Sequence, residues 1–259
     1  MMQCWPSGMP QTQHLLDVAW QARQEDAAAC ARRFARMQAN LAGCDPLVRR
    51  WCEVAATPAA ARIPLPLDIP GLAHRLEQAR VPPSPDFVDE DQGFNLLAWN
   101  GGEGPDHASL ILQAGSNRSG DDWMNDMSNS VGIAFEPLEP ANADLLTVAT
   151  LKPILLALID AWEPVTGNVR PLRLLDHWLC EPPNFDQFRI HGGWMTYLAP
   201  SWRHPVEPPP GAIVEETPDG GLLMIATEQT FDLRDRVHVA AAYAIHQSLA
   251  PFWRSMPGA

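Results

Sequence analysis

The sequence contains almost no lysine. Lys152 is the single one, so arginine supplies nearly all of the positive charge, and the formal net charge is −13. A phosphate-binding loop of the G-x-x-x-x-G-K-[ST] type is excluded, because Lys152 precedes a proline and no such glycine pattern occurs. The usual nuclease arrangement, a carboxylate two residues before a catalytic lysine, is excluded because Thr150 occupies that position. A chain this acidic is repelled by nucleic acid and by anionic lipid, so we expect neither as a partner.

Paired cysteines and long apolar runs are also missing. The five cysteines are odd in number and include no C-x-x-C pair, which favours a reducing cytoplasm over a disulfide framework. The most continuous apolar run, residues 154–159, is far too short to span a bilayer. The start of the sequence, MMQCWPSGMPQ, lacks the cationic and apolar regions of a secretory signal. We therefore expect a cytoplasmic protein, and the apolar fraction of 46% predicts that it folds.

The tripeptide HGG at 191–193 is the one segment that suggests a hydrolase. It can begin the oxyanion-hole loop of an esterase, but the G-x-S-x-G nucleophile elbow that such an enzyme requires does not occur, and GSNRSG at 115–120 has the wrong spacing. We therefore interpret Gly192 and Gly193 as residues that permit a close turn before a strand. Trp194 and Tyr197 lie three positions apart in that strand, so we expect them to face opposite sides of the sheet, one toward the core and the other on an exposed sheet face.

The remaining histidines and carboxylates do not form a recognisable motif. His238 and His246 are eight residues apart on one predicted helix, which separates their Cα atoms by about 12 Å. No H-E-x-x-H pattern supports the other histidines as metal ligands. Adjacent carboxylates in loops lack a placed partner acid. We expect no cofactor, no metal and no catalytic residue, while a hydrolase with a site at His177 or His191 stays open as an alternative.

Hydrophobic periodicity predicts an α+β fold. Helical spacing occurs at 24–43, 45–54, 71–80, 145–162 and 235–250, and alternation predicts strands at 93–102, 107–114, 193–198, 212–217 and 221–229. Pro153 interrupts the stripe at 145–162, so that helix either kinks there or starts near Thr150. Residues 13–22 fit either a strand or the lead-in to a helix. The order strand, strand, helix occurs at 93–162 and again at 193–252. We expect a single domain over 1–259, an antiparallel sheet with helices packed on one face, and, as a hypothesis, two similar halves at 1–165 and 166–259.

Four segments resemble a known family. They are WQARQEDAAACARRFARMQANLAGCDPLVRRW (20–51), LAWNGG (97–102), LIDAWEP (158–164) and GGWMTYL (192–198). In this order and spacing they are similar to the immunity protein 52 family, antidotes in polymorphic-toxin and type VI secretion systems of proteobacteria. The resemblance implies an α+β protein without catalytic activity that binds and neutralises a cognate toxin, commonly one of restriction-endonuclease fold. It assigns no catalytic residues, and it implies mainly scaffold roles at the shared aromatic positions, with a local ion pair between Arg23 and Glu25.

Acidic side chains beside large apolar ones are the candidates for toxin contact. A nuclease presents a basic cleft, which an acidic partner can approach and hold. The first candidate patch takes acids, an aromatic residue and a methionine from the polar loop 116–130 and two acids from the preceding turn: Asp121, Asp122, Trp123, Met124, Asp126, Glu103 and Asp106. The second candidate patch lies at the last hairpin: Glu215, Glu216 and Asp219. Ordinary solvated loops are the alternative for both patches, and an adaptor or chaperone for a type VI effector is a third class of function.

Overall fold

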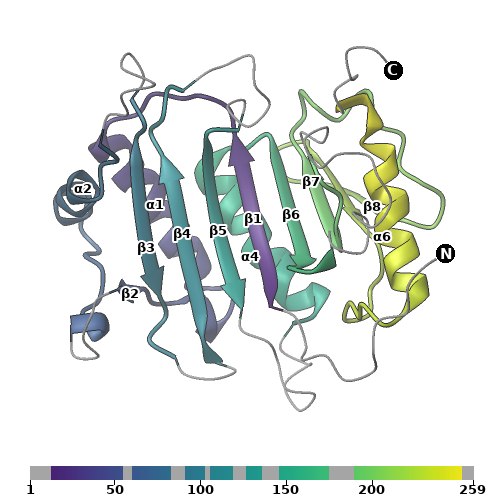
Figure 1. Ribbon diagram of the computed structural model, residues 1–259, viewed down its shortest axis with the longest axis horizontal. Helices are drawn as coiled ribbons and strands as arrows, with labels where there is room; N and C mark the ends of the chain where they lie inside the picture. Colours follow the sequence, from purple (N-terminus) through teal and green to yellow (C-terminus); the bar gives the residue numbers. More distant parts are fainter. Residues whose placement is uncertain are drawn as a thin grey trace.

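The computed structural model describes residues 13–54, 60–82, 91–102, 106–118, 127–135, 146–174 and 190–252, which build a twisted antiparallel sheet with helices against it (Figure 1). The strands are β1 (His14–Trp20), β2 (Cys52–Glu53), β3 (Phe94–Trp99), β4 (Ala108–Ala114), β5 (Asn129–Phe135), β6 (Thr166–Pro171), β7 (Met195–Leu198), β8 (Ile213–Glu216) and β9 (Leu222–Ile225). The helices are α1 (Ala27–Leu41), α2 (Ile69–Gln78), α4 (Val148–Trp162) and α6 (Arg236–Ser248), with 3-10 turns at Pro46–Val48, Ala60–Arg62 and Ala250–Phe252. The predicted α+β class is confirmed.

The described strands form one nine-stranded sheet in the order β2-β3-β4-β5-β1-β6-β7-β9-β8. The first strand of the chain lies near the middle, where β1 pairs antiparallel with β5 on one side and with β6 on the other. The sheet is therefore continuous across the boundary of the two predicted halves. Their strand orders differ, because β3, β4 and β5 follow one another in space while β9 lies between β7 and β8. The similarity that we hypothesised does not extend to strand order.

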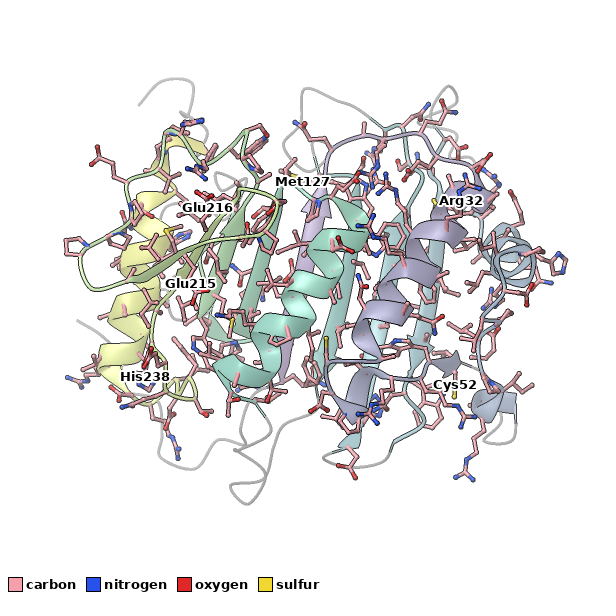
Figure 2. All side chains as sticks on the ribbon, turned by 180° about the vertical axis from the view of Figure 1, so that it is seen from behind. Arg32, Cys52, Met127, Glu215, Glu216 and His238 are labelled. Atoms are coloured by element: carbon pink, nitrogen blue, oxygen red, sulfur yellow. The ribbon has the colours of Figure 1, made fainter. Side chains whose placement is uncertain are left out.

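Helices α1 and α4 pack side by side on one face of this sheet (Figure 2). Strand β1 shows why, because Leu16, Val18 and Trp20 alternate with partly exposed residues and are buried against the helices. The indole of Trp20 stacks on that of Trp162 in α4, with ring centroids 5.1 Å apart. Each fully buried large side chain contributes about 1.5–3 kcal/mol. The apolar stripe predicted for α1 faces this core: Ala27, Cys30, Ala31, Phe34, Met37 and Leu41.

The ends of α1 and α4 are fixed by caps and by an ion-pair network. Asp26 accepts a hydrogen bond of 2.7 Å from the backbone N–H of Ala29, which places the start of α1 at Ala27. The expected pair of Arg23 and Glu25 is present at 3.1 Å. Glu25 also pairs with Arg33 at 2.7 Å, and Arg33 with Glu163 at 3.2 Å. The network joins the end of β1 to both helices.

Helix α6 lies across the opposite face, at the end of the sheet formed by β7, β8 and β9, so the helices do not all pack on one face as expected (Figure 1). All four residues of β7, Tyr197 among them, are consequently buried, and so is the preceding Trp194. The expectation that one of these two aromatic side chains lies on an open sheet face is wrong, because the sheet is covered on both sides here. Among the described helices, none combines the length and apolarity that crossing a bilayer requires.

Candidate functional site

The first candidate patch lies mostly in segments that the structure does not describe. Glu103, Asp121, Asp122, Trp123, Met124 and Asp126 fall outside the described residues. Asp106 is described and exposed, and its backbone carbonyl accepts a hydrogen bond of 2.7 Å from the side-chain amide of Asn100. The side-chain oxygen of Asn100 accepts hydrogen bonds from the backbone N–H groups of Gly102 and Ala108, each at 3.0 Å. Asn100 therefore ties together the described residues on either side of 103–105.

A buried asparagine joins the two ends of the segment that carries the rest of the first patch. The side-chain oxygen of Asn129, at the start of β5, accepts from the N–H of Ser116 at 2.9 Å. Its side-chain nitrogen donates to the carbonyls of Ser116, at 3.1 Å, and Gln21, at 3.0 Å. The fully buried Asn129 is a polar residue that periodicity did not single out. It holds the described residues before and after the acidic segment together, which limits where that segment begins and ends.

The second candidate patch is engaged within the molecule. Glu215 pairs with Lys152 of α4 at 2.8 Å, and Glu216 pairs with Arg203 at 3.0 Å. Figure 2 shows both glutamates on the side of α4 that lies toward the yellow helix α6. A toxin cation would have to compete with these two intramolecular partners.

Asp219 serves the turn between β8 and β9. Its carboxylate accepts hydrogen bonds from the hydroxyls of Thr217, at 2.6 Å, and Tyr197. Burial raises the pKa of Asp219, but the hydrogen bonds from Thr217, Tyr197 and Gly221 outweigh it and hold the pKa below its usual range. Burial, together with the adjacent carboxylate, raises the pKa of the Tyr197 hydroxyl. The tyrosine stays protonated and anchors the turn.

The HGG segment has no free pair of amides for an oxyanion. The N–H of Gly192 donates to Nδ1 of His246 at 3.3 Å, and the N–H of Gly193 donates to the hydroxyl of Thr196 at 3.0 Å. A Cβ at Gly192 would lie 2.6 Å from the backbone of His246, and one at Gly193 would lie 2.7 Å from the carbonyl oxygen of Val169. The scaffold interpretation is confirmed by these contacts, since both glycines are required by the close approach of α6 and β6.

The ring of His191 stacks on that of His246 in α6, with ring centroids 6.0 Å apart. Burial lowers the pKa of His191 to about 3, and the nearby charges of Arg170 and His246 act in the same direction. Burial lowers the pKa of His246 to about 4. Both rings are therefore neutral at pH 7, and a histidine with so low a pKa is a weak general base.

The described residues also give little support to a metal or hydrolase site. His177 lies outside them, and no group of three or more His, Cys, Asp or Glu side chains within them is arranged to hold a metal ion. Arg170 of β6, whose charge acts on His191, also approaches the carboxylate of Asp17 on β1 at 3.8 Å. Burial raises the pKa of Asp17, while Arg170 partly opposes this shift.

A second surface is formed by the side chains of β3, β4, β5 and β1 that point away from α1 and α4. We call it the open face: Asn95, Leu97, Trp99, Ser109, Ile111, Gln113, Ser130, Gly132, Ala134, Leu15, Asp17 and Ala19. No helix among the described residues covers it over β3, β4 and β5 (Figure 1). Leu97 and Ile111 lie directly opposite each other on adjacent strands and are 46% and 48% exposed. Sequence reasoning assigned these strands but did not identify this face as a surface for contact.

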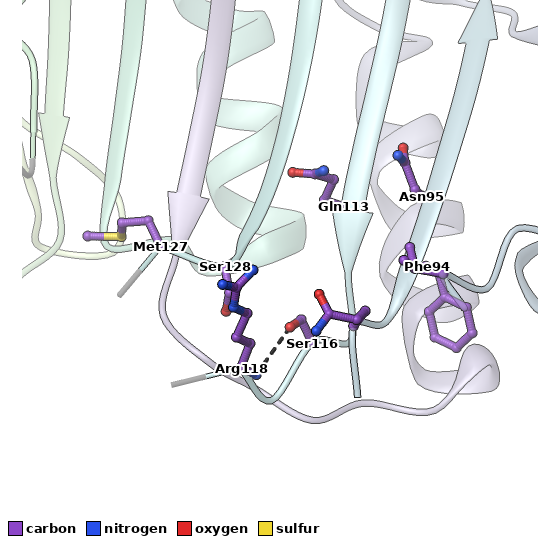
Figure 3. A pocket seen from close by; sticks show the side chains of 9 residues that line it. Phe94, Asn95, Gln113, Ser116, Arg118, Met127 and Ser128 are labelled. Atoms are coloured by element: carbon purple, nitrogen blue, oxygen red, sulfur yellow. Dashed lines mark hydrogen bonds between the residues drawn. The ribbon is translucent and has the colours of Figure 1, made fainter. Parts of the chain in front are cut away.

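One end of the open face contains a shallow hollow of about 240 Å³ (Figure 3). Its lining takes Asn95 and Gln113 from the open face and adds residues from the strand ends: Val81, Gln92, Phe94, Ser116, Arg118, Met127 and Ser128. The N–H of Arg118 donates to the hydroxyl of Ser116 at 3.1 Å. The lining is mostly polar and carries one charged side chain, so it lacks a paired acid and base. It adjoins the described ends of the segment that carries the first patch.

Comparison with known proteins gives a matching family and similar solved structures. Residues 14–252 match the family described as Immunity protein 52. A comparison with curated proteins finds no match. The T6SS protein PA0821 of Pseudomonas aeruginosa is similar in structure, with a TM-score of 0.46, 11% identity, and coverage of 93% of this chain and 74% of that chain. A similarity at that level carries no argument about function, so the family match is the finding to build on.

Proposed function

The chain belongs to the immunity protein 52 family, and from this membership we propose that it binds and neutralises a cognate antibacterial toxin by forming a tight protein–protein complex. The observation that carries the proposal is the length of the match, which covers residues 14–252 and therefore nearly all of the sheet and helices described above. The family suggests a protein that acts by binding and not by catalysis. The two amides of the HGG segment, each with an intramolecular acceptor, support the same view.

The proposed toxin is a basic nuclease of restriction-endonuclease fold, delivered by a type VI or related secretion system. The support is charge, because a net charge of −13 attracts a protein that presents a cationic DNA-binding cleft. Electrostatic attraction of this kind raises the association rate and orients the partners before contact. We propose that the complex forms in the cytoplasm, where a nuclease meets DNA.

The first candidate patch is the proposed source of charge contacts. Reversing Asp121 and Asp122 to lysine should weaken binding by about 2 kcal/mol or more if they meet arginine or lysine side chains of the toxin, because each reversed charge replaces attraction by repulsion. The matched control reverses Glu207 and Glu228, which are exposed and change the net charge equally. If both double variants bind as the parent does, the first patch is not a contact.

The function is tested by expressing the neighbouring gene product in a bacterial host with and without this protein. The proposal predicts that the neighbour kills alone, that co-expression restores growth, and that the purified pair forms a complex in which the toxin no longer cleaves DNA. A complex that cleaves DNA at the full rate would indicate an adaptor or chaperone. A harmless neighbour, or one that kills regardless of co-expression, would contradict the proposal.

A further inference from the structure

The open face differs from the rest of this acidic protein because it is nearly free of charge. Asp17 is the single charged residue among its side chains, which otherwise are small, apolar or amide-bearing. The alternate residues of the same strands form the core against α1 and α4, so the lack of charge on the open face is not required by burial. Depletion of charged residues is the compositional signature of the centre of a protein–protein interface.

Leu97 and Ile111 are the apolar centre of the open face. They are directly opposed on β3 and β4, and such cross-strand pairs place their Cβ atoms about 4.5–5.5 Å apart. Each leaves nearly half of its side chain exposed. Trp99, two residues along β3, adds a partly buried indole whose N–H donates to the carbonyl of Glu53 at 3.1 Å. These three side chains are held by paired strands, so a partner would bind a rigid apolar strip.

The rest of the open face is a flat floor of small residues beside that strip. On β5 it presents Ser130, Gly132 and Ala134, and on β1 it presents Ala19. Side chains this short let a partner approach the sheet closely without displacing anything. The floor therefore suits a convex or flat protein surface better than a small ligand, which requires concave walls.

The size of the open face indicates what else has to take part. Four strands spaced by about 4.8 Å, each with about seven residues at about 3.3 Å per residue, present roughly 19 Å by 23 Å, or about 440 Å². A stable complex buries about 800 Å² on each partner. The open face alone supplies about half of that area, so a partner would also have to contact surface beyond it.

The segments that connect these strands are rich in acids at both strand ends. The chain reads PDFVDED at 85–91 before β3 and DDWMND at 121–126 between β4 and β5, which join one end of the strands. It reads EGPD at 103–106 between β3 and β4, at the other end. A second copy of the chain would carry the same net charge of −13 and be repelled, whereas a basic partner would be attracted.

Resting on the proposed function, we propose that the open face is the centre of the toxin-binding surface, with Leu97 and Ile111 as its apolar anchor. The occupant is a basic protein surface that presents apolar side chains to β3 and β4 and is attracted by the net charge of −13. An uncharged centre with a charged rim is the usual division of roles in a protein complex, in which the desolvated centre carries most of the affinity.

The test is the Kd of the cognate toxin for the double variant Leu97→Thr/Ile111→Thr. Threonine is β-branched, as exposed strand positions favour, so the fold should be retained. We expect the Kd to rise at least about 100-fold, as for truncation of central interface residues. The matched control is Val214→Thr, because Val214 is 46% exposed on β8, at the far edge of the sheet, and its loss should leave the Kd within about threefold.

Ile111→Glu separates apolar contact from charge. The added carboxylate should attract a basic toxin, so weaker binding in spite of it requires an apolar contact at this position. A cysteine at the same position, Ile111→Cys, gives a readout that does not depend on affinity, since its alkylation, followed on the peptide by mass spectrometry, should be fast in the free protein and suppressed in the complex.

The outcomes distinguish the position of the toxin-binding surface from toxin binding itself. If the parent binds the toxin but Leu97→Thr/Ile111→Thr binds equally well, or Val214→Thr weakens binding as much, the open face is not the anchor and the proposed function stands. If the parent does not bind the toxin, both fail. If the parent alone sediments as a dimer that the double variant dissociates, the occupant is a second copy and the assignment to the toxin is wrong.

Discussion

Acidification from pH 7 to pH 5.5 should destabilise the protein through two buried histidines. Burial, reinforced by the charges of Arg170 and His246, lowers the pKa of His191 to about 3, and burial lowers the pKa of His246 to about 4. In the unfolded chain both rings return to an ordinary pKa of about 6.5. The folded state therefore keeps them neutral over a range of pH in which the unfolded state takes up protons.

The sign and the size of the effect follow from this difference. Because the pKa of each histidine is depressed in the folded state, its contribution to stability is present above pH 6.5 and is lost as the pH falls toward about 4 for His246 and about 3 for His191. Between pH 7 and pH 5.5, proton uptake stabilises the unfolded state relative to the folded state by about 1.3 kcal/mol per histidine, or about 2.5 kcal/mol for both. Such a change is a large part of the stability of an ordinary domain.

Carboxylates act differently in this range. Asp160, Asp219 and Asp232 have a lowered pKa, so their contributions are lost only below the ordinary carboxylate range of about 4. Asp17 opposes the histidines, because burial raises its pKa and its protonation favours the folded state as the pH falls. The variant Asp17→Asn removes that opposing contribution and isolates the histidines.

The assay is urea denaturation at pH 7.0, 6.5, 6.0 and 5.5. In the Asp17→Asn background the free energy of unfolding should fall by about 2.5 kcal/mol over this range, and adding His246→Gln should halve the loss. His204→Gln is the control, since His204 is exposed and its replacement should leave the loss unchanged. A loss that is equal with and without His246, or a stability that is flat with pH in Asp17→Asn, would refute the reasoning.

Three further outcomes are expected. Gly192→Ala should cost about 1–3 kcal/mol of stability by urea denaturation, because its Cβ would meet the backbone of α6 at 2.6 Å, whereas Gly43→Ala, whose nearest atom is 3.6 Å away, should change stability by less than about 1 kcal/mol. Trp20→Ala should lower the free energy of unfolding by about 3–5 kcal/mol through loss of its stack on Trp162. Val237→Ala, at a residue 74% exposed, should change it by no more than about 0.5 kcal/mol, and equal effects would contradict the placement of the core. Raising the salt concentration should slow association with the toxin far more than it changes dissociation, measured by surface plasmon resonance, and a salt-independent association rate would argue against electrostatic attraction.

Local patterns predicted those elements of the fold that have strong periodicity. The stripe through Cys30, Phe34 and Met37 identified α1, and the alternation through Leu110 and Leu112 identified β4. The ambiguous segment before α1 is the strand β1. Its place near the middle of the sheet depends on pairing with segments more than a hundred residues away, a long-range choice that no local pattern contains.

Three strands were missed. The helix predicted at 45–54 is wrong, because the structure has a 3-10 turn at Pro46–Val48 followed by the short strand β2. In β5, Val131, Ile133 and Phe135 alternate with small residues directly after the polar loop 116–130, and we predicted no strand there. In β6, the sequence TGNVRP has low strand propensity, and only tertiary contact buries Asn168. Since β5 and β6 flank β1, missing them concealed the centre of the sheet.

The candidate site was less predictable than the fold. Acidic loops are visible in a sequence, so the two patches could be named, but the pairing of Glu215 with Lys152 depends on tertiary structure. The exposure of Leu97 and Ile111 was equally hidden, because alternation assigns two faces to a strand without saying which face a helix covers. Helix α6 covers this face of the sheet only at the end formed by β7, β8 and β9, so the part over β3, β4 and β5 is left without a helix among the described residues.

The most direct test of toxin neutralisation is the affinity of the purified protein for the purified toxin domain encoded beside it, measured by titration calorimetry at physiological salt. Membership of the immunity protein 52 family predicts a one-to-one complex with a Kd of about 10 nM or lower, since an antidote has to hold its toxin at low cellular concentrations. The absence of any complex with both proteins at about 10 µM would contradict the account.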